Sequence, residues 1–352
     1  MATSGTVSTT TFDTRKVIDH ALRRCRIPTP QVTPEMQQIG RENLYLLLSA
    51  LANRGLPLWT IQKQILPLVT GQIQLDMPTG TIDVLNSTLR NLTRLEGDYL
   101  SSAAGTVANA FDDDYDTSCT QTSTNGNISI ELESETLLTS WGILPNGALT
   151  TALALDKSDD GTTWTVVATY ASDTYSDEVW YWFDIDPAPT ALFYRLRATG
   201  GGTLNLRELY FGNTPNEIPM YRMNRDDYVN LPNKMFQSRP VQFWFDRQRD
   251  TPVMWLWPAV SDQFREYQIV ITRARYIEDV GTLQQTLDIP QRWYEAIVWM
   301  LAWRMAAELP EVDKALIPTL KAMNDEQMSL VEAEERDNSP IKIAPDVSMY
   351  TA

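Results

Sequence analysis

The sequence predicts an α+β protein in which a helical bundle with a small β-sheet carries an inserted β-sandwich of the jelly-roll type. Both ends of the chain hold long segments with apolar residues at helical spacing, whereas the middle is rich in Ser, Thr and Gly with short alternating strands. Acidity is concentrated in that middle segment. Residues 97–213 hold 17 acidic and four basic residues, a net charge of −13, and the rest of the chain has a net charge of −3.

An insertion of one domain into another explains this pattern, since insertions succeed at exposed loops. The sequence predicts a discontinuous domain over residues 1–96 and 214–337, an inserted sandwich over 97–213 and an extended C-terminal arm over 338–352. Both ends of the insertion carry a glycine, and we expect them to lie close together.

The first flank predicts three helices and a strand region. A helix is expected over residues 12–26, and a second over 33–55, where a threonine N-cap precedes proline and a glycine follows the last turn. A third, shorter helix is expected over 58–66. Alternating residues over 71–85 predict short strands around a Pro-Thr-Gly turn.

The second flank mixes strands and helices. Strands are predicted over residues 240–245, 253–257 and 267–276 from their alternation. A helix with a buried stripe is expected from Asp288 to Pro310, and a last helix over 316–336.

Composition excludes several classes of protein. A net charge of −16 opposes binding of duplex DNA, which rests on neutralising phosphates with Lys and Arg. One histidine and two cysteines provide neither a disulfide framework nor the common zinc ligand sets. The N-terminus lacks the charged and apolar regions of a signal peptide, and the apolar run over 296–303 is too short to span a bilayer, so we expect synthesis in a reducing cytoplasm.

Catalytic patterns are also lacking. His20 and Cys25 are five residues apart on one predicted helix, about 140° around its axis, so they do not share a face. No phosphate-binding loop, HExxH or GxSxG pattern occurs. The sequence predicts no enzyme, no catalytic residue and no cofactor.

Two groups in the inserted segment admit a binding role. Asp112, Asp114 and Asp116 fit the first alternate positions of an EF-hand loop, but the required glycine and glutamate are absent. Another kind of calcium loop and a solvated acidic turn both stay open. The second group consists of three tryptophans, Trp164, Trp180 and Trp182. Their aromatic rings are compatible either with stacking on sugars or with burial in the core.

The two flanks together resemble the head-to-tail adaptors of short-tailed bacteriophages, of the tail tubular protein A type. The resemblance spans about 230 residues and rests on the order of several stretches rather than on one specific motif. These stretches are LANRGLPLW, Gly71-Gln72-Ile73-Gln74-Leu75, Tyr221-Arg222-Met223, Asp226-Asp227-Tyr228, Met254-Trp255-Leu256-Trp257-Pro258 and Ile289-Pro290-Gln291-Arg292-Trp293.

This resemblance implies a structural virion protein. It would form a ring of twelve copies that joins the portal to the tail nozzle, a tail tubular protein B-like partner, and genomic DNA would pass through without specific binding. The chain would be made in the host bacterial cytoplasm and reside in the virion neck. We expect Ile341, Ile343 and Tyr350 of the arm to contact the portal or a neighbouring subunit.

The inserted segment resembles the discoidin-type, galactose-binding-like domains. The carrying stretches are Ala110-Phe111-Asp112-Asp113-Asp114, Ser158-Asp159-Asp160-Gly161-Thr162-Thr163-Trp164, Tyr194-Arg195-Leu196-Arg197 and Leu206-Arg207-Glu208-Leu209-Tyr210. Asp113 stands where that family has glycine, and Cys119 where tryptophan is common. The resemblance implies the fold more than a ligand. It supplies the alternative function, a carbohydrate-binding or peptidoglycan-cleaving tail protein with a host surface glycan as its partner.

Overall fold

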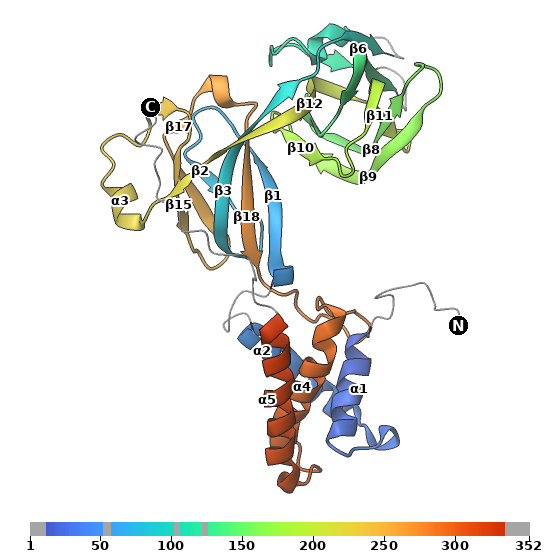
Figure 1. Ribbon diagram of the computed structural model, residues 1–352, viewed down its shortest axis with the longest axis vertical. Coiled ribbons are helices and arrows are strands. Elements are labelled where there is room, and N and C mark those ends of the chain that lie inside the picture. The colour runs from blue at the N-terminus through green and yellow to red at the C-terminus, as the bar shows by residue number, and fades with distance from the viewer. Residues whose placement is uncertain (1–11, 52–57, 102–105, 122–125, 335–352) are drawn as a thin grey trace. The chain divides into compact units, whose positions relative to one another are not determined.

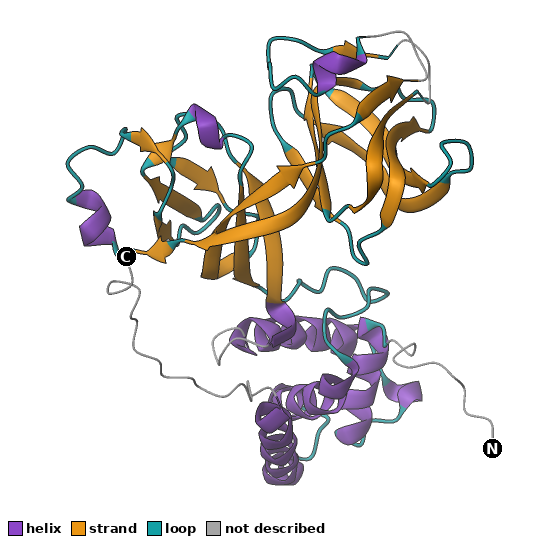
Figure 2. Cartoon of the chain, turned by 45° about the horizontal axis from the view of Figure 1, so that its top comes forward, coloured by secondary structure: helices purple, strands orange, loops and turns teal. Residues whose placement is uncertain are grey.

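The computed structural model describes residues 12–51, 58–101, 106–121 and 126–334 (Figure 1). The chain forms two compact units. One comprises residues 1–62 and 274–352 and is helical, and the other comprises residues 63–273 and consists almost wholly of strands (Figure 2). The small sheet therefore belongs to the same unit as the sandwich, whereas the predicted division groups it with the helices.

The helical unit is organised around one helix that packs against three others. Its helices are α1 (Thr14–Arg24), α2 (Pro34–Leu51), α4 (Tyr294–Glu308) and α5 (Ile317–Glu334). The predicted stripe of α4 is buried, because Ile297, Leu301 and Met305 are fully excluded from solvent between α1, α2 and α5. Gly40 allows α1 and α2 to approach closely, since a Cβ there would lie 2.6 Å from a methyl carbon of Ile18.

Side-chain caps determine where two of these helices begin. The carboxylate of Asp13 accepts a hydrogen bond of 2.8 Å from the backbone N–H of Lys16. Thr33 Oγ1 accepts one of 3.2 Å from the N–H of Met36, which confirms the predicted start of the second helix. The predicted glycine cap at its end lies outside the described residues.

The prediction of a third helix over residues 58–66 is wrong. A single turn of 3₁₀ helix, Leu58–Thr60, leads into a strand, β1 (Ile61–Pro67). β1 pairs with the strand formed by residues 268–275, distant in sequence. The pairing satisfies the backbone of a segment too short for a stable helix, so tertiary contact overrides the local pattern.

The described residues of the second unit form four sheets. The largest has the order β1-β18-β3-β12-β7-β10, with β5 beside β12, and its further strands are β18 (Gln268–Arg275), β3 (Thr81–Arg94), β12 (Asn205–Pro219), β7 (Ser140–Pro145), β10 (Tyr181–Asp184) and β5 (Cys119–Thr120). A five-stranded sheet contains β4 (Asp98–Ser101), β6 (Asn127–Leu137), β11 (Thr190–Thr199), β8 (Leu149–Ser158) and β9 (Thr165–Tyr175), in that order. A four-stranded sheet contains β13 (Tyr221–Arg222), β15 (Gln242–Asp246), β16 (Val253–Trp257) and β2 (Gln74–Asp76). A pair is formed by β14 (Gln237–Ser238) and β17 (Ala259–Val260), and a short helix, α3 (Arg225–Val229), follows β13.

The long strands β3 and β12 belong to two β-sandwiches at once. Near one end of the sheet, β1, β18 and β3 face the four-stranded sheet across a core that includes Phe243 and Ile271. At the other end, β12, β7 and β10 face the five-stranded sheet across a core that includes Trp141 and Tyr194. The inserted segment is therefore a β-sandwich, as predicted, and its sheet continues into the part of the chain that carries it.

The two ends of the inserted segment lie side by side. Gly212 pairs with Arg94 and Asn213 with Thr93 in the antiparallel register of β12 and β3. A Cβ at Gly212 would approach Leu92 and Tyr210 to about 3 Å, which explains why the smallest residue stands at this exit. The expectation that the ends of the insertion meet is correct.

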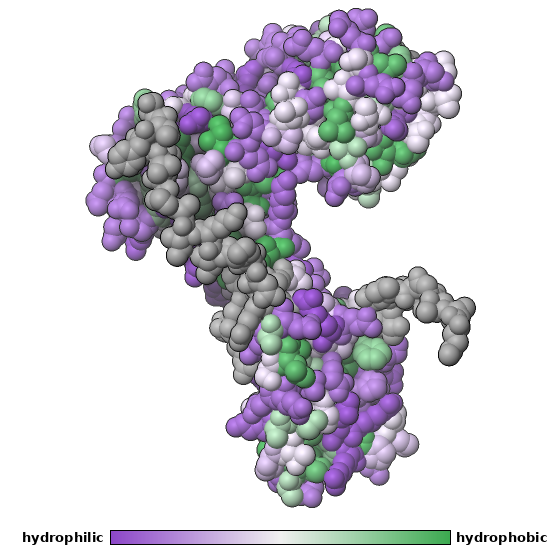
Figure 3. All heavy atoms as spheres, viewed as in Figure 1, coloured by the Kyte–Doolittle hydropathy of each residue, from purple (hydrophilic) through white to green (hydrophobic). Residues whose placement is uncertain are grey.

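The surface agrees with the acidic, polar composition. On the face of the sandwich seen in Figure 3, hydrophilic residues predominate and hydrophobic ones are scattered among them. None of the described helices combines the length and apolarity that a membrane crossing requires.

Candidate functional site

His20 and Cys25 do not form a catalytic pair, because each contacts other residues. The ring of His20 stacks on Phe12 at a centroid distance of 5.3 Å. Cys25 is buried, and its thiol donates to the carbonyl of Ala302 at 3.2 Å. Burial raises the pKa of Cys25 to about 11. The thiol is therefore neutral at physiological pH and unsuited to nucleophilic attack.

The acidic loop is built as a series of tight turns rather than as a metal site. Asp112 Oδ1 accepts from the N–H of Asp114 at 3.1 Å, and Asp114 Oδ1 accepts from the N–H of Asp116 at 3.0 Å. Thr117 Oγ1 lies 3.0 Å and 3.1 Å from the two carboxylate oxygens of Asp112. In the described residues, no group of three or more acidic, His or Cys side chains is arranged to hold a metal ion. The calcium interpretation of Asp112, Asp114 and Asp116 gains no support.

Arginines hold this loop against strands β3 and β12 and against the turn that precedes β18. Arg94 of β3 forms an ion pair with Asp113. Arg265 donates to the Asp113 carbonyl at 2.8 Å, and its guanidinium lies 3.5 Å from the centre of the Tyr115 ring. Arg207 of β12 donates to the Tyr115 carbonyl at 2.6 Å. The loop thus fastens the inserted sandwich to the part of the chain that carries it.

Arg94 also reaches a buried carboxylate. Glu208 of β12 is fully buried, and its Oε2 accepts from Arg94 at 2.7 Å. Burial raises the pKa of Glu208 to about 7, Arg94 opposes this rise, and the neighbouring carboxylates Asp112 and Glu266 add to it. Its other oxygen, Oε1, accepts no hydrogen bond from any described residue.

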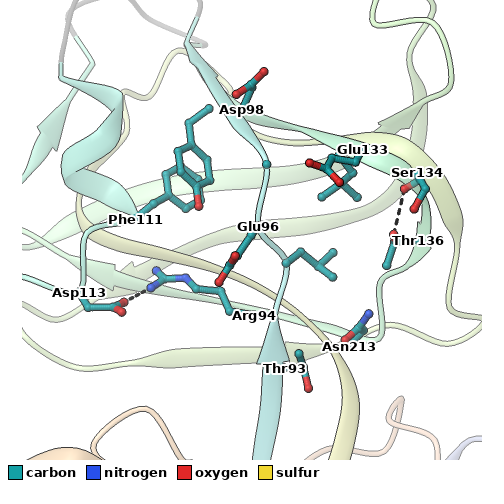
Figure 4. Close-up of a pocket in the computed structure, with 14 residues that line it drawn as sticks. Thr93, Arg94, Glu96, Asp98, Phe111, Asp113, Glu133, Ser134, Thr136 and Asn213 are labelled. Atoms are coloured by element: carbon teal, nitrogen blue, oxygen red, sulfur yellow. Dashed lines mark hydrogen bonds and ion pairs between the residues drawn. The ribbon is translucent and has the colours of Figure 1, made fainter.

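One pocket, of about 750 Å³, opens beside this cluster where the chain enters and leaves the sandwich (Figure 4). Arg94 points toward Asp113 at one side of it. Its aromatic side chains, Tyr99 and Phe111, stack on each other with centroids 4.0 Å apart. Because these two rings cover each other, the pocket offers mainly polar and acidic side chains. They are Thr93, Glu96, Asp98, Glu133, Ser134, Thr136 and Asn213.

A second pocket, which we call the aromatic groove, has a volume of about 650 Å³ and lies at the edge strand β10. Its lining residues are Gln64, Ile65 and Pro67 of β1, Thr169, Tyr170, Ala171, Ser172, Asp173 and Tyr175 of β9, and Val179, Trp180, Tyr181, Trp182 and Phe183 on and before β10. Four of these aromatic side chains, Tyr170, Tyr181, Trp182 and Phe183, are only partly buried. The groove therefore combines aromatic surface with hydroxyl, amide and carboxylate groups.

Packing on both faces of β10 fixes the aromatic side chains of the groove. Phe183 stacks on Trp141 with centroids 4.3 Å apart. Tyr170 accepts a hydrogen bond of 3.1 Å from the indole N–H of Trp141. Trp182 lies over Gly142 of the paired strand β7, where a Cβ would be only 2.4 Å from the indole ring. Glycine at that position is what lets the indole lie flat against the sheet.

The three predicted glycan-contact tryptophans have different surroundings. Trp180 is 2% exposed and donates to the Tyr115 hydroxyl at 2.9 Å, so it belongs to the core. Trp164, at the turn between β8 and β9, is covered by the guanidinium of Arg195, 4.1 Å from its ring centre. Trp182 alone of the three combines partial exposure with a place in the groove.

Sequence reasoning missed most of the groove. The residues of β1 that line it belong to a segment for which the sequence predicts a helix. No sequence pattern identifies Tyr170, Tyr181 or Phe183 as binding residues. The local signal was the run Val-Trp-Tyr-Trp-Phe over residues 179–183, whose density of aromatics exceeds what one buried strand face needs. The predicted contact residues Ile341, Ile343 and Tyr350 lie outside the described residues.

Comparison with known proteins gives only distant likenesses. No family model and no curated protein matches the chain. Among solved structures, the CpGH89CBM32-5 module of Clostridium perfringens, in complex with GalNAc-β-1,3-galactose, is 18% identical with a TM-score of 0.30, covering 33% of this chain and 94% of the module. The CBM32 of AlyQ, in complex with 4,5-unsaturated mannuronic acid, is 15% identical with a TM-score of 0.30, covering 35% and 99%. A chitosan-binding module from the chitosanase/glucanase of Paenibacillus sp. IK-5 is 20% identical with a TM-score of 0.30, covering 35% and 99%. Likenesses at this level assign no ligand to the chain.

Proposed function

We propose that the inserted β-sandwich, a galactose-binding-like domain by its resemblance, binds carbohydrate in the aromatic groove. The observation that carries the proposal is the group of partly exposed aromatic side chains in a groove that also holds amide and hydroxyl groups. A pyranose ring has an apolar C–H face that loses unfavourable hydration against an aromatic ring, while its hydroxyls need hydrogen-bond partners. The groove offers both.

The charges of the groove favour neutral sugars. Among the described residues that line it, none is Lys or Arg, and Asp173 contributes a carboxylate. The whole chain carries a net charge of −16. An anionic glycan would meet like charge without a compensating cation, so a neutral hexose chain is the expected ligand class.

The test uses the full chain against soluble glycans of different charge. We expect measurable binding by isothermal titration calorimetry to at least one of laminarin, galactan and chitin oligomers, and none to polygalacturonate. Trp182→Ala should weaken binding at least tenfold, because it removes a partly exposed indole from the lining of the groove. Trp164→Ala is the matched control, since Trp164 lies outside the groove and its face is already covered by Arg195.

Two results would contradict the proposal. One is an absence of binding to every neutral glycan tested by a chain whose circular dichroism shows it folded. The other is equal binding by wild type and Trp182→Ala. Neither the carbohydrate-binding proposal nor the assembly proposal below includes catalysis. Release of fragments from peptidoglycan by the purified chain would therefore count against both.

A second proposal concerns the flanks, which resemble phage head-to-tail adaptors. Exposed hydrophobic residues favour an assembly role: Tyr221, Val229, Met235 and Phe236 are each more than half exposed and fall within one short stretch of the chain. Contiguous apolar surface marks protein interfaces, and the closeness of these four residues in the chain favours such a surface. Under this proposal the chain forms a ring in the virion neck between portal and nozzle, encloses passing DNA without specific contacts, and presents the sandwich to host glycans.

Electron microscopy of the purified chain, alone and mixed with its portal protein, tests the assembly proposal. Rings that dock on portal particles are expected for wild type. Met235→Ser with Phe236→Ser should reduce docking or ring formation, whereas Val166→Ser, an exposed apolar residue of the inserted segment, should not. A chain that stays monomeric in both conditions would refute the adaptor proposal and leave glycan binding standing.

A further inference from the structure

The aromatic groove has a wall that does not belong to the inserted segment. Gln64, Ile65 and Pro67 come from β1, which precedes the insertion, and they line the same groove as the aromatic residues of β9 and β10. We propose that the carbohydrate site is composite, with β1 contacting the bound sugar chain directly. The inference rests on the proposed carbohydrate binding and extends it to residues outside the sandwich.

The geometry of the largest sheet brings these two walls together. β1 and β10 stand at opposite ends of its strand order. Even so, Lys63 Nζ at the start of β1 lies 3.1 Å from Asp184 Oδ2 at the end of β10. The sheet is therefore coiled enough for its two edges to meet, as strong strand twist allows. The groove is lined by residues of β1 together with residues of β9 and β10.

A polar network built around the buried guanidinium of Arg90 links the walls. Asp184 accepts hydrogen bonds from Arg90 at 2.8 and 3.1 Å and from Ser140 Oγ at 2.6 Å. Arg90 of β3 is 3% exposed and donates from Nε to Gln268 of β18 at 2.8 Å. Five strands, β1, β3, β7, β10 and β18, thus meet through this group, and a charge pair held by several hydrogen bonds resists displacement.

The network stays charged at neutral pH. Burial acts to raise the pKa of Asp184, but hydrogen bonds from Arg90 and Ser140, together with the charge of Arg90, hold that pKa below its ordinary value. Asp184 is therefore ionised wherever the protein is expected to work, and the two walls keep one spacing.

The chemistry of the β1 wall complements that of the aromatic wall. Gln64 provides an amide that both donates and accepts hydrogen bonds, which suits a sugar hydroxyl. Ile65 and Pro67 add an apolar surface opposite the aromatic rings. Both faces of a pyranose ring would then be covered, one by aromatic carbon and the other by the β1 side chains. β10 is also an edge strand, so its outer backbone groups are not paired with another described strand and remain available to hydroxyls.

The experiment measures glycan affinity in the full chain, because the inserted segment shares its sheet with β1. The probe is the neutral glycan that wild type binds best. We expect Gln64→Ala and Ile65→Ala each to raise Kd by about fivefold, the size of one lost hydrogen bond or a small lost apolar contact. Val69→Ala is the control, since Val69 is exposed and follows β1 outside the groove. Gln64→Ala removes a half-buried polar side chain, so it leaves the core intact even where Ile65→Ala lowers stability.

The outcomes separate this inference from the function on which it rests. Weaker binding by the β1 variants and by Trp182→Ala, with Val69→Ala unchanged, supports the composite site. Loss of binding by Trp182→Ala alone, with both β1 variants at wild-type affinity, overturns it and leaves carbohydrate binding by the sandwich intact. No binding by wild type to any neutral glycan overturns both.

Discussion

Replacement of Glu208 by glutamine should stabilise the protein, and by an amount that grows with pH. The carboxylate is fully buried, and its second oxygen accepts no hydrogen bond from a described residue. Its pKa is about 7 in the folded chain, mainly because burial disfavours the charge. In an unfolded chain a glutamate titrates near pH 4.3, about 2.7 units lower, and each unit corresponds to about 1.4 kcal/mol. Ionised Glu208 therefore costs the native state about 4 kcal/mol.

The direction of the pH dependence follows from this difference. The folded pKa is raised, so the contribution of Glu208 to stability is fully present below about pH 4.3 and is lost as pH rises through about 7. Glutamine resembles the protonated acid and does not titrate. The variant and wild type should unfold at similar urea concentrations near pH 4.5. At pH 8 the variant should be more stable by up to about 4 kcal/mol.

Urea unfolding monitored by tryptophan fluorescence between pH 4.5 and 8 measures the effect, taken from the transition that involves the sandwich. Glu133→Gln is the matched control, because Glu133 is an exposed carboxylate of the same segment. The reasoning would be refuted by a Glu208→Gln variant that is no more stable than wild type at pH 8. A stability gain that stays constant across the pH range would refute it equally, because the cause would then not be ionisation.

Three further predictions test separate parts of the structure. Gly142→Ala should displace Trp182, since the new Cβ would lie 2.4 Å from its ring. We expect the free energy of unfolding to fall by about 1–3 kcal/mol and the affinity for glycan to fall with it. An unchanged melting temperature would contradict this prediction. Asp184→Ala should lower the free energy of unfolding by about 2–3 kcal/mol, which is less than the loss expected for a fully buried ion pair, because the Asp184 side chain is 34% exposed. A loss within experimental error would show that the buried Arg90 does not need Asp184 as its partner. Cys25, with a pKa of about 11, should not react with a thiol-specific disulfide reagent at pH 8 until the protein is denatured, and rapid reaction of the native protein would contradict its burial.

Local patterns predicted much of the fold because their physical cause is local. The strand over residues 253–257 matches β16, and the buried stripe of α4 follows from apolar spacing alone. The Ser-Asp-Asp-Gly turn lies between β8 and β9, where the backbone N–H groups of Thr162 and Thr163 donate to Asp160. Each of these features involves residues within a few positions of one another, so no distant partner had to be known.

The candidate site could not be predicted in this way because its parts are joined only by the sheet. β1 became a strand through β18, about 200 residues later in the chain, and only that pairing places Gln64 and Ile65 beside β10. Trp180 and Trp182 were equal candidates from the sequence. Two residues apart, they lie on one face and stack with centroids 4.7 Å apart. Trp180 is buried and donates to Tyr115, whereas Trp182, over Gly142 of β7, stays partly exposed, and this difference depends on the register with β7 and on the surrounding residues.

The junction of the two sandwiches explains in part how the chain accommodates the concentration of acidic residues in the inserted segment. The inserted segment carries a net charge of −13 with only four basic residues. At the junction, cations from outside it approach its anions or carbonyls: Lys63 and Arg90 at Asp184, Arg94 at Asp113, and Arg265 at the Asp113 carbonyl. Pairing across the boundary offsets part of the mutual repulsion of the acidic residues, in addition to the ion pairs that Arg195, Arg197 and Arg207 form within the segment. The acidic composition therefore contributes to holding the sandwich on its carrier, and with it the two walls of the groove.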